Sequence, residues 1–97
     1  MNSLQRLQDW YFANCDEDWE HAYGISVETL DNPGWTLTID LTGTSVENKE
    51  FKAYEYGMGQ DNHEWVHCQV DGRQFKAAGG PHKLEEMIDI FLAWASG

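Results

Sequence analysis

Two runs of alternating apolar and polar residues, joined by a short turn-forming link, constrain this chain most strongly. Residues 23–30 and 35–41 each carry apolar side chains at every second position, which is the period of a β-strand with one buried face. The link between them is Asp31-Asn32-Pro33-Gly34. Asp and Asn accept turn conformations, Pro33 fixes its own φ, and Gly34 is expected to supply a left-handed position. The stretch therefore predicts a β-hairpin on which a sheet is built.

The same hairpin predicts where the core begins. Alternate side chains of a strand point to the same side of a sheet, so the apolar positions of the two runs can share one face. Four of them are expected to be central core residues: Ile25, Val27, Leu37 and Ile39. The turn between the runs then sets the register of these side chains.

The other segments predict two helices and three more strands. Apolar residues recur at helical spacing over residues 4–15, with Ser3 as the expected N-cap, and again from Leu84 onwards. Pro81 is expected at the first position of the last helix, where a missing N–H is harmless. The further strands are expected at residues 51–56, 64–70 and 73–77, with Asp71-Gly72 as the turn between the last two. In the last two strands, alternation places Val66, Cys68, Val70, Phe75 and Ala77 on the core face.

These elements predict an α+β fold. An antiparallel sheet of about five sequential strands, connected as hairpins, would be packed by an N-terminal and a C-terminal helix in a single domain over residues 1–97. The apolar stripe of the last helix is wider than one sheet face requires. Either this helix also packs against the first helix, or Ile90 and Trp94 meet another molecule.

Composition indicates the cellular compartment in which the chain is expected to fold. No apolar run approaches the roughly 20 residues that span a bilayer, and residues 2–8 are too polar for a signal peptide. A soluble, cytoplasmic protein is therefore expected. Its two thiols, Cys15 and Cys68, are expected to be buried and free rather than joined in a disulfide.

Charge is the strongest compositional signal. Six Lys and Arg stand against seventeen Asp and Glu, a formal net charge of −11. Such a surface repels nucleic acid and anionic membranes and attracts basic proteins. The charge either serves solubility alone or marks a protein that binds a basic partner.

The sequence contains no motif for catalysis, metal binding or a cofactor. Serines, histidines and acids occur, but none stands in a nucleophile motif with an activating partner. His63, His67 and Cys68 lack the paired spacing of a structural zinc site, and neighbouring strand residues point to opposite faces. We therefore expect a protein that is not an enzyme and that uses no cofactor or metal.

Segments spread along the chain resemble the immunity protein 53 family of bacterial polymorphic toxin systems. The segments that carry the resemblance are Cys15-Asp16-Glu17-Asp18-Trp19-Glu20-His21, Thr29-Leu30-Asp31-Asn32-Pro33-Gly34-Trp35 and Gly79-Gly80-Pro81, together with Trp10, Gly24-Ile25, Leu41-Thr42, Leu84, Phe91 and Trp94. The resemblance covers essentially the whole chain. It implies a protein that binds and neutralises a cognate toxin and so protects the producing cell. If that toxin is a nuclease, its basic active-site cleft would be the natural target.

Acidic and aromatic residues in two parts of the chain are the candidate toxin-binding residues. The first group is Asp16, Glu17, Asp18 and Glu20, and the second is Tyr54, Glu55, Tyr56, Asp61, Glu64 and Trp65. Rings beside carboxylates can grip a basic surface, because the rings supply affinity and the acids supply association rate and register.

Each group also has a structural alternative. Trp19 could be a buried anchor that pins a solvated loop at residues 16–20, and the second group could be a solvated sheet face with cross-strand aromatic pairs. From a different functional class, Tyr54, Tyr56 and Trp65 could form the site of a small acidic enzyme or ligand-binding domain. Such a site requires a concave pocket with converging polar groups.

Overall fold

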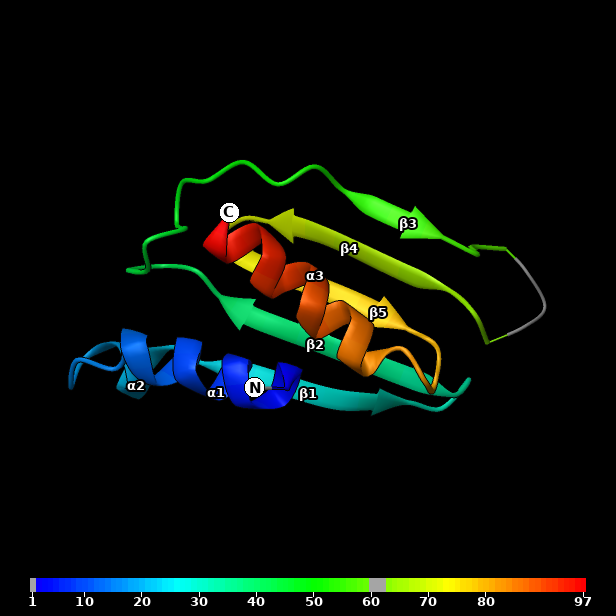
Figure 1. The fold of residues 1–97 in the computed structure, drawn as a ribbon, viewed down its shortest axis with the longest axis horizontal. Coiled ribbons are helices and arrows are strands. Elements are labelled where there is room, and N and C mark those ends of the chain that lie inside the picture. The colour runs from blue at the N-terminus through cyan, green and yellow to red at the C-terminus, as the bar shows by residue number, and fades with distance from the viewer. Residues whose placement is uncertain (1, 60–62) are drawn as a thin grey trace.

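An antiparallel sheet and the helices at both ends of the chain make up the fold (Figure 1). The computed structural model describes residues 2–59 and 63–97. The helices are α1 (Ser3–Asn14), α2 (Trp19–Ala22) and α3 (Leu84–Ser96). The strands are β1 (Ile25–Leu30), β2 (Gly34–Asp40), β3 (Tyr54–Tyr56), β4 (Val66–Asp71) and β5 (Gln74–Gly79). The predicted α+β class is confirmed.

One connection in the sheet, from β2 to β3, is not a hairpin. The spatial order is β1-β2-β5-β4-β3, so β5 returns to the middle of the sheet between β2 and β4. Residues 41–53 carry the chain from β2 past the end of α3 to the far edge (Figure 1). Val46 is buried beneath this crossing, and the Lys49 ammonium donates hydrogen bonds to the carbonyls of Trp94 (2.6 Å) and Gly97 (2.8 Å). The crossing is thereby fastened to the end of α3.

The core lies between α3 and one face of the sheet. Leu37 of β2 is opposite Ala77 of β5, which is opposite Cys68 of β4, and these three side chains are buried. Ile39 and Phe75 form the neighbouring buried pair. The predicted inward faces of β2, β4 and β5 are therefore confirmed, and α3 covers them by lying across β2 and β5 (Figure 1).

Helix α1 packs beside α3 in the same layer. The Trp10 ring meets the Phe91 ring edge to face, with centroids 4.9 Å apart, and the Ser3 hydroxyl donates a hydrogen bond to Asp89. On the other flank of α3, Trp94 packs against Phe51. Packing of the last helix against the first explains its wide apolar stripe. Within the described residues, no helix is long and apolar enough to cross a membrane.

Both long helices begin at residues other than those predicted. Asn2, not Ser3, caps α1, because its side chain accepts the Gln5 N–H (2.8 Å) while the Gln5 side chain accepts the Asn2 N–H (3.1 Å). This reciprocal capping box needs a Gln or Glu three residues after the cap, which only Asn2 has. Pro81 lies in a turn before α3, and its carbonyl accepts the indole N–H of Trp35 (3.0 Å).

The opening hairpin forms as predicted, with two corrections. Gly34 does not adopt a left-handed conformation. It is required because a Cβ at this position would lie 2.4 Å from the Gly79 carbonyl oxygen of the neighbouring strand. Val27 is not a core residue either, since it is 43% exposed. It faces the same side as buried Leu37, its cross-strand partner, but β1 is an edge strand that α3 does not cover.

Truncation of Phe91 tests the packing of this core. Phe91 is fully buried and contacts rings of α1 and β5, so Phe91→Ala is expected to lower the free energy of unfolding by about 3–5 kcal/mol in urea denaturation. Phe12→Ala removes the same ring from a site that is 75% exposed on α1 and should change stability by less than about 0.5 kcal/mol. Equal losses from the two variants would contradict the core described here.

Candidate functional site

The two groups of candidate residues lie at opposite edges of the sheet (Figure 1). The first group occupies the loop between α1 and α2 and the start of α2, on the β1 side. In the second group, Tyr54, Glu55 and Tyr56 form β3 at the other edge, and Glu64 and Trp65 precede β4. Asp61 lies outside the described residues. The structure therefore does not bring the two groups together into one surface.

Two acids of the first group hold the loop in shape. The Asp16 carboxylate accepts hydrogen bonds from the backbone N–H groups of Trp19 (2.8 Å) and Asp18 (3.0 Å). The Glu20 carboxylate reaches back to the N–H groups of Asp16 and Glu17, both at 2.9 Å. The two carboxylates thus accept hydrogen bonds from the backbone N–H groups of residues 16–19 at the entrance to α2, which a helix start otherwise leaves unpaired.

These contacts also lower the pKa values of both acids. The N–H groups of Trp19 and Asp18 hold the pKa of Asp16 below its ordinary 3.8. Backbone N–H groups, first that of Glu20 itself and then those of Asp16 and Glu17, hold the pKa of Glu20 below its ordinary 4.5. The physical cause is the same in both cases, because a donated hydrogen bond favours the ionised carboxylate.

Glu17 and Asp18 are exposed, as is Asp16, but their carboxylates do not hold the loop. Within residues 2–59 and 63–97, no hydrogen bond or ion pair occupies either carboxylate. Glu17 has φ of 78°, a left-handed conformation that costs a non-glycine residue roughly 1 kcal/mol. The hydrogen bonds of Asp16 and Glu20 maintain this conformation, so the loop presents two unpaired carboxylates on a fixed backbone.

Trp19 anchors the loop, as its structural alternative proposed. The side chain is 5% exposed and its indole N–H donates to the Thr42 carbonyl (2.9 Å) just after β2. Its ring also meets the edge of Trp10, with centroids 6.1 Å apart. Trp19 therefore fixes the position of the acidic loop and is not itself available to a partner.

In the second group, Tyr56 is engaged inside the protein. Its hydroxyl donates a 2.6 Å hydrogen bond to the Glu86 carboxylate of α3, which raises the pKa of Tyr56. The Lys83 ammonium lies 5.7 Å from the Tyr56 ring centroid, 3.5 Å from Glu64 and 3.9 Å from Glu86. Tyr56, Lys83, Glu64 and Glu86 thus join the β3 edge to the start of α3. The sequence did not indicate this cluster because its members are up to thirty residues apart.

On β3, Tyr54 and Glu55 remain exposed. Tyr54 is 45% exposed, and Glu55, whose side chain is 62% exposed, lies 3.9 Å from His67 of β4. Neighbouring strand residues point to opposite faces, so the carboxylate of Glu55 and the two rings of β3 lie on different sides of the sheet. Trp65 is half-buried.

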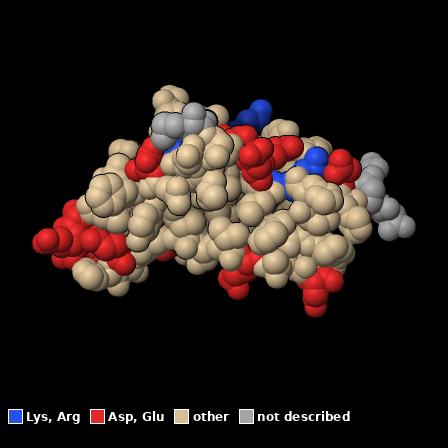
Figure 2. Space-filling view, turned by 60° about the horizontal axis from the view of Figure 1, so that its bottom comes forward, with Lys and Arg blue, Asp and Glu red and all other residues tan. Residues whose placement is uncertain are grey.

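Charge is distributed very unevenly along the chain. Residues 7–48 hold nine of the seventeen acidic residues and none of the six Lys and Arg. This segment builds most of α1, then α2, β1 and β2. Figure 2, which turns the β1 side forward, shows acidic side chains gathered at the end where the α1–α2 loop lies, beside a central area without charge. The segment that builds most of this side of the molecule therefore contributes no Lys or Arg, and Arg6 directly precedes it in the first turn of α1.

The two thiols and the possible metal ligands are the other groups that could carry out chemistry. Cys15 and Cys68 are free thiols, as predicted; Cys68 is buried and Cys15 only partly so. Burial raises the pKa of the Cys68 thiol to about 12, which keeps it protonated and unreactive. Among the described residues, no group of three His, Cys, Asp or Glu side chains is placed to hold a metal ion.

Comparison with known proteins places the chain in one family. The sequence profile of Immunity protein 53 matches residues 4–96 of the 97-residue chain, and the chain therefore belongs to this family. Curated proteins and solved structures give no significant match.

Acidification tests the role assigned to Asp16. Because its folded pKa is lowered, its ionisation stabilises the fold at pH values above the ordinary 3.8, and this contribution is lost as pH falls through the folded pKa. Asp16→Asn keeps an acceptor but not the charge, so we expect a lower melting temperature than wild type at pH 7 and a difference that shrinks towards about pH 2. Asp18→Asn, the matched control at a carboxylate that accepts no hydrogen bond from the described residues, should leave the melting temperature at pH 7 close to that of wild type. A pH-independent deficit for Asp16→Asn would contradict the role.

Proposed function

We propose that this member of the Immunity protein 53 family neutralises a cognate toxin by binding it directly, in a stoichiometric complex and without a catalytic step. The observation that carries the proposal is the family match over residues 4–96. Members of an immunity family are expected to bind the toxin from which they protect the cell. The free but unreactive thiol of Cys68 and the structural use of Asp16 and Glu20 favour a binding role over catalysis.

Charge supports a basic toxin surface as the target. The Lys- and Arg-free segment at residues 7–48 creates a one-signed field on one side of the molecule, which attracts a positively charged partner and accelerates encounter. A nuclease would offer such a surface, because a cleft that binds phosphates must be basic. A basic nuclease is therefore the proposed class of toxin.

The acidic loop is the part of this side best suited to first contact. Glu17 and Asp18 are exposed and unpaired, on a backbone held by Asp16, Glu20 and Trp19. A loop whose backbone is already held in place loses little backbone conformational entropy when it binds. The β3 group is the competing surface, with Tyr54 and Glu55 as its exposed members.

The direct test uses the C-terminal domain of the polymorphic toxin encoded immediately upstream of this gene. We expect it to co-purify with the immunity protein as a 1:1 complex, and co-expression should restore growth of cells that produce the toxin domain. Protection without a complex would mean that the protein acts by another mechanism. No complex and no protection would contradict the proposed function.

Charge reversal identifies the surface in the same assay. The double variant Glu17→Lys with Asp18→Lys should lower the association rate constant by about tenfold at low salt, because it removes the steering charge, with a smaller effect at high salt. The matched control, Glu50→Lys with Glu55→Lys, makes the same change in net charge at exposed sites nearer the other edge. Equal slowing by the two variants would show that net charge alone matters and would contradict the assignment to the loop.

A further inference from the structure

Apolar side chains that reach solvent are concentrated on α1 and in the segment from Tyr23 to Val27. Seven large hydrophobic side chains are exposed among the described residues, and five of them lie between residues 4 and 27. They are Leu4, Tyr11, Phe12, Tyr23 and Val27. A contiguous exposed apolar area rimmed by polar residues is typical of an interaction site.

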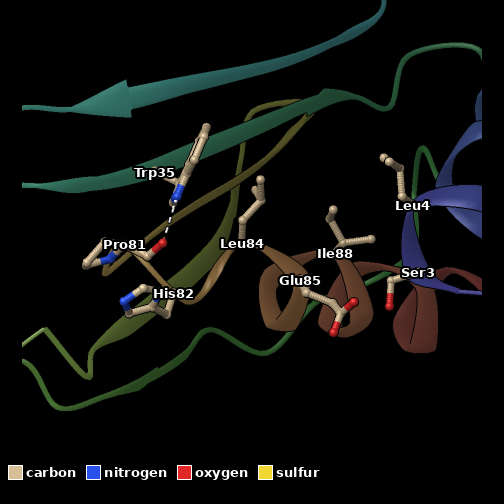
Figure 3. A pocket seen from close by; sticks show the side chains of 8 residues that line it. All are labelled: Ser3, Leu4, Trp35, Pro81, His82, Leu84, Glu85 and Ile88. Atoms are coloured by element: carbon tan, nitrogen blue, oxygen red, sulfur yellow. Dashed lines mark hydrogen bonds between the residues drawn. The ribbon is translucent and has the colours of Figure 1, made fainter.

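Two hollows give this apolar area its shape. The first, of about 440 Å³, lies between α1 and the start of β1 and is lined by Leu7, Tyr11, Tyr23 and Ile25, with Gln8 and Gly24. The second, of about 370 Å³, lies beyond the first turn of α1, where Leu4 faces Leu84 and Ile88 of α3, with Trp35 at the other end (Figure 3). Both hollows are predominantly apolar.

Val27 connects the two hollows along β1. Ile25 lines the first hollow, and Trp35 of the second is the cross-strand partner of Thr29. Ile25, Val27 and Thr29 share one face of the strand, so exposed Val27 lies between the hollows. We name the surface formed by Leu4, Leu7, Tyr11, Ile25, Val27 and Trp35 the α1–β1 groove.

The outer edge of β1 is open alongside this groove. Among the described residues, β1 pairs only with β2. The Asp40 N–H donates to the carbonyl of Gly24 (3.0 Å), its opposite residue. Hydrogen-bonded and non-bonded pairs alternate in an antiparallel ladder, so the N–H and C=O groups of Ile25, Val27 and Thr29 point outward. The strand contains no Pro, Lys or Arg, the residues that commonly block strand addition.

Acidic residues border the same groove. Tyr23 lines the first hollow and also a smaller one that it shares with Asp16, Asp18 and Trp19. The acidic loop therefore adjoins one end of the groove. Glu28 of β1 and Asp31 of the following turn are exposed further along the strand, within the segment that has no Lys or Arg.

We infer that the α1–β1 groove and the free edge of β1 form the toxin-docking surface and take an extended, basic segment of the toxin. The segment adds to β1 as a strand, places an apolar side chain in the groove near Val27, and directs Lys or Arg to Glu17 and Asp18. Main-chain hydrogen bonds then supply affinity, and the groove with its acidic border supplies specificity. This inference rests on the proposed function and adds the location and mode of binding.

Charge favours a toxin over a second copy of this chain. Two copies that met through β1 would bring together two segments that each hold nine acids and no Lys or Arg. Like charges at an interface are repulsive, whereas a basic segment meets complementary charge at the acidic loop and at Glu28 and Asp31.

Substitution of Val27 tests the groove with the same upstream toxin domain. Val27→Glu keeps the sign of charge that attracts a basic partner but places a carboxylate in the apolar groove, so we expect toxin affinity to fall at least tenfold in calorimetry. Ser26→Glu is the matched control, because it adds the same charge to the same strand on the opposite face and should change affinity less than threefold. Thr29→Pro removes an outward N–H, which an edge strand tolerates, and should also weaken binding.

The outcomes separate this inference from the proposed function. Thermal unfolding of each free variant first shows that it is folded. Wild-type binding with an unchanged affinity for Val27→Glu and Thr29→Pro would overturn the groove alone, and equal losses for Val27→Glu and Ser26→Glu would do the same. A dimer of the free chain that Val27→Glu dissociates would assign the groove to a second copy and overturn the inference. Failure of the wild-type protein to bind the toxin domain would contradict the proposed function itself.

Discussion

The contact between Phe91 of α3 and Phe75 of β5 is the interaction on which the rest of the structure depends. Both rings are fully buried, with centroids 5.1 Å apart. Phe91 also meets Trp10 of α1, and Phe75 meets Phe51 at the end of the crossing segment. Two rings thus link both long helices, the centre of the sheet and the connection to its far edge. Such pairs each contribute about 0.5–1.5 kcal/mol beyond the area that they bury.

This arrangement also explains why one apolar surface stays open. Since α3 occupies the middle of the sheet, α1 packs on the flank of α3, and β1 is left largely exposed. Val27 of β1 is exposed on the part of the sheet face that the helices do not cover, and Leu4 of α1 is also exposed. The four acidic residues of the loop at residues 16–20 have two different roles. Asp16 and Glu20 hold the loop that borders this surface, whereas Glu17 and Asp18 are free to meet a partner.

Much of the fold could be predicted from local sequence patterns, because strand alternation and helical spacing are properties of neighbouring residues. The inward faces of β2, β4 and β5 followed from alternation alone. The position of β5 between β2 and β4 could not be predicted, since it depends on how residues 41–53 cross the end of the sheet. Val27 was wrongly assigned to the core for a related reason. Alternation predicts which face of a strand a side chain is on, but whether another element covers that face depends on tertiary packing.

The candidate site was predicted less well than the fold. The acidic residues at positions 16–20 could be identified from the sequence. Which of their carboxylates accept hydrogen bonds could not, because it depends on backbone N–H groups that the folded loop brings close. The bond from Tyr56 to Glu86 joins residues distant in the chain, so its ring could not be identified as structural beforehand. One sequence signal, the absence of Lys and Arg from residues 7–48, marks the side of the molecule on which we propose that the toxin docks.

Amide hydrogen exchange, measured with and without the upstream toxin domain, tests the central claim most directly. Within residues 2–59 and 63–97, the outward N–H groups of Ile25, Val27 and Thr29 have no hydrogen-bond partner, and we expect them to exchange more slowly once the toxin pairs with β1. The amides of β3 should exchange at unchanged rates. Protection confined to β3, with none on β1, would contradict docking at the α1–β1 groove.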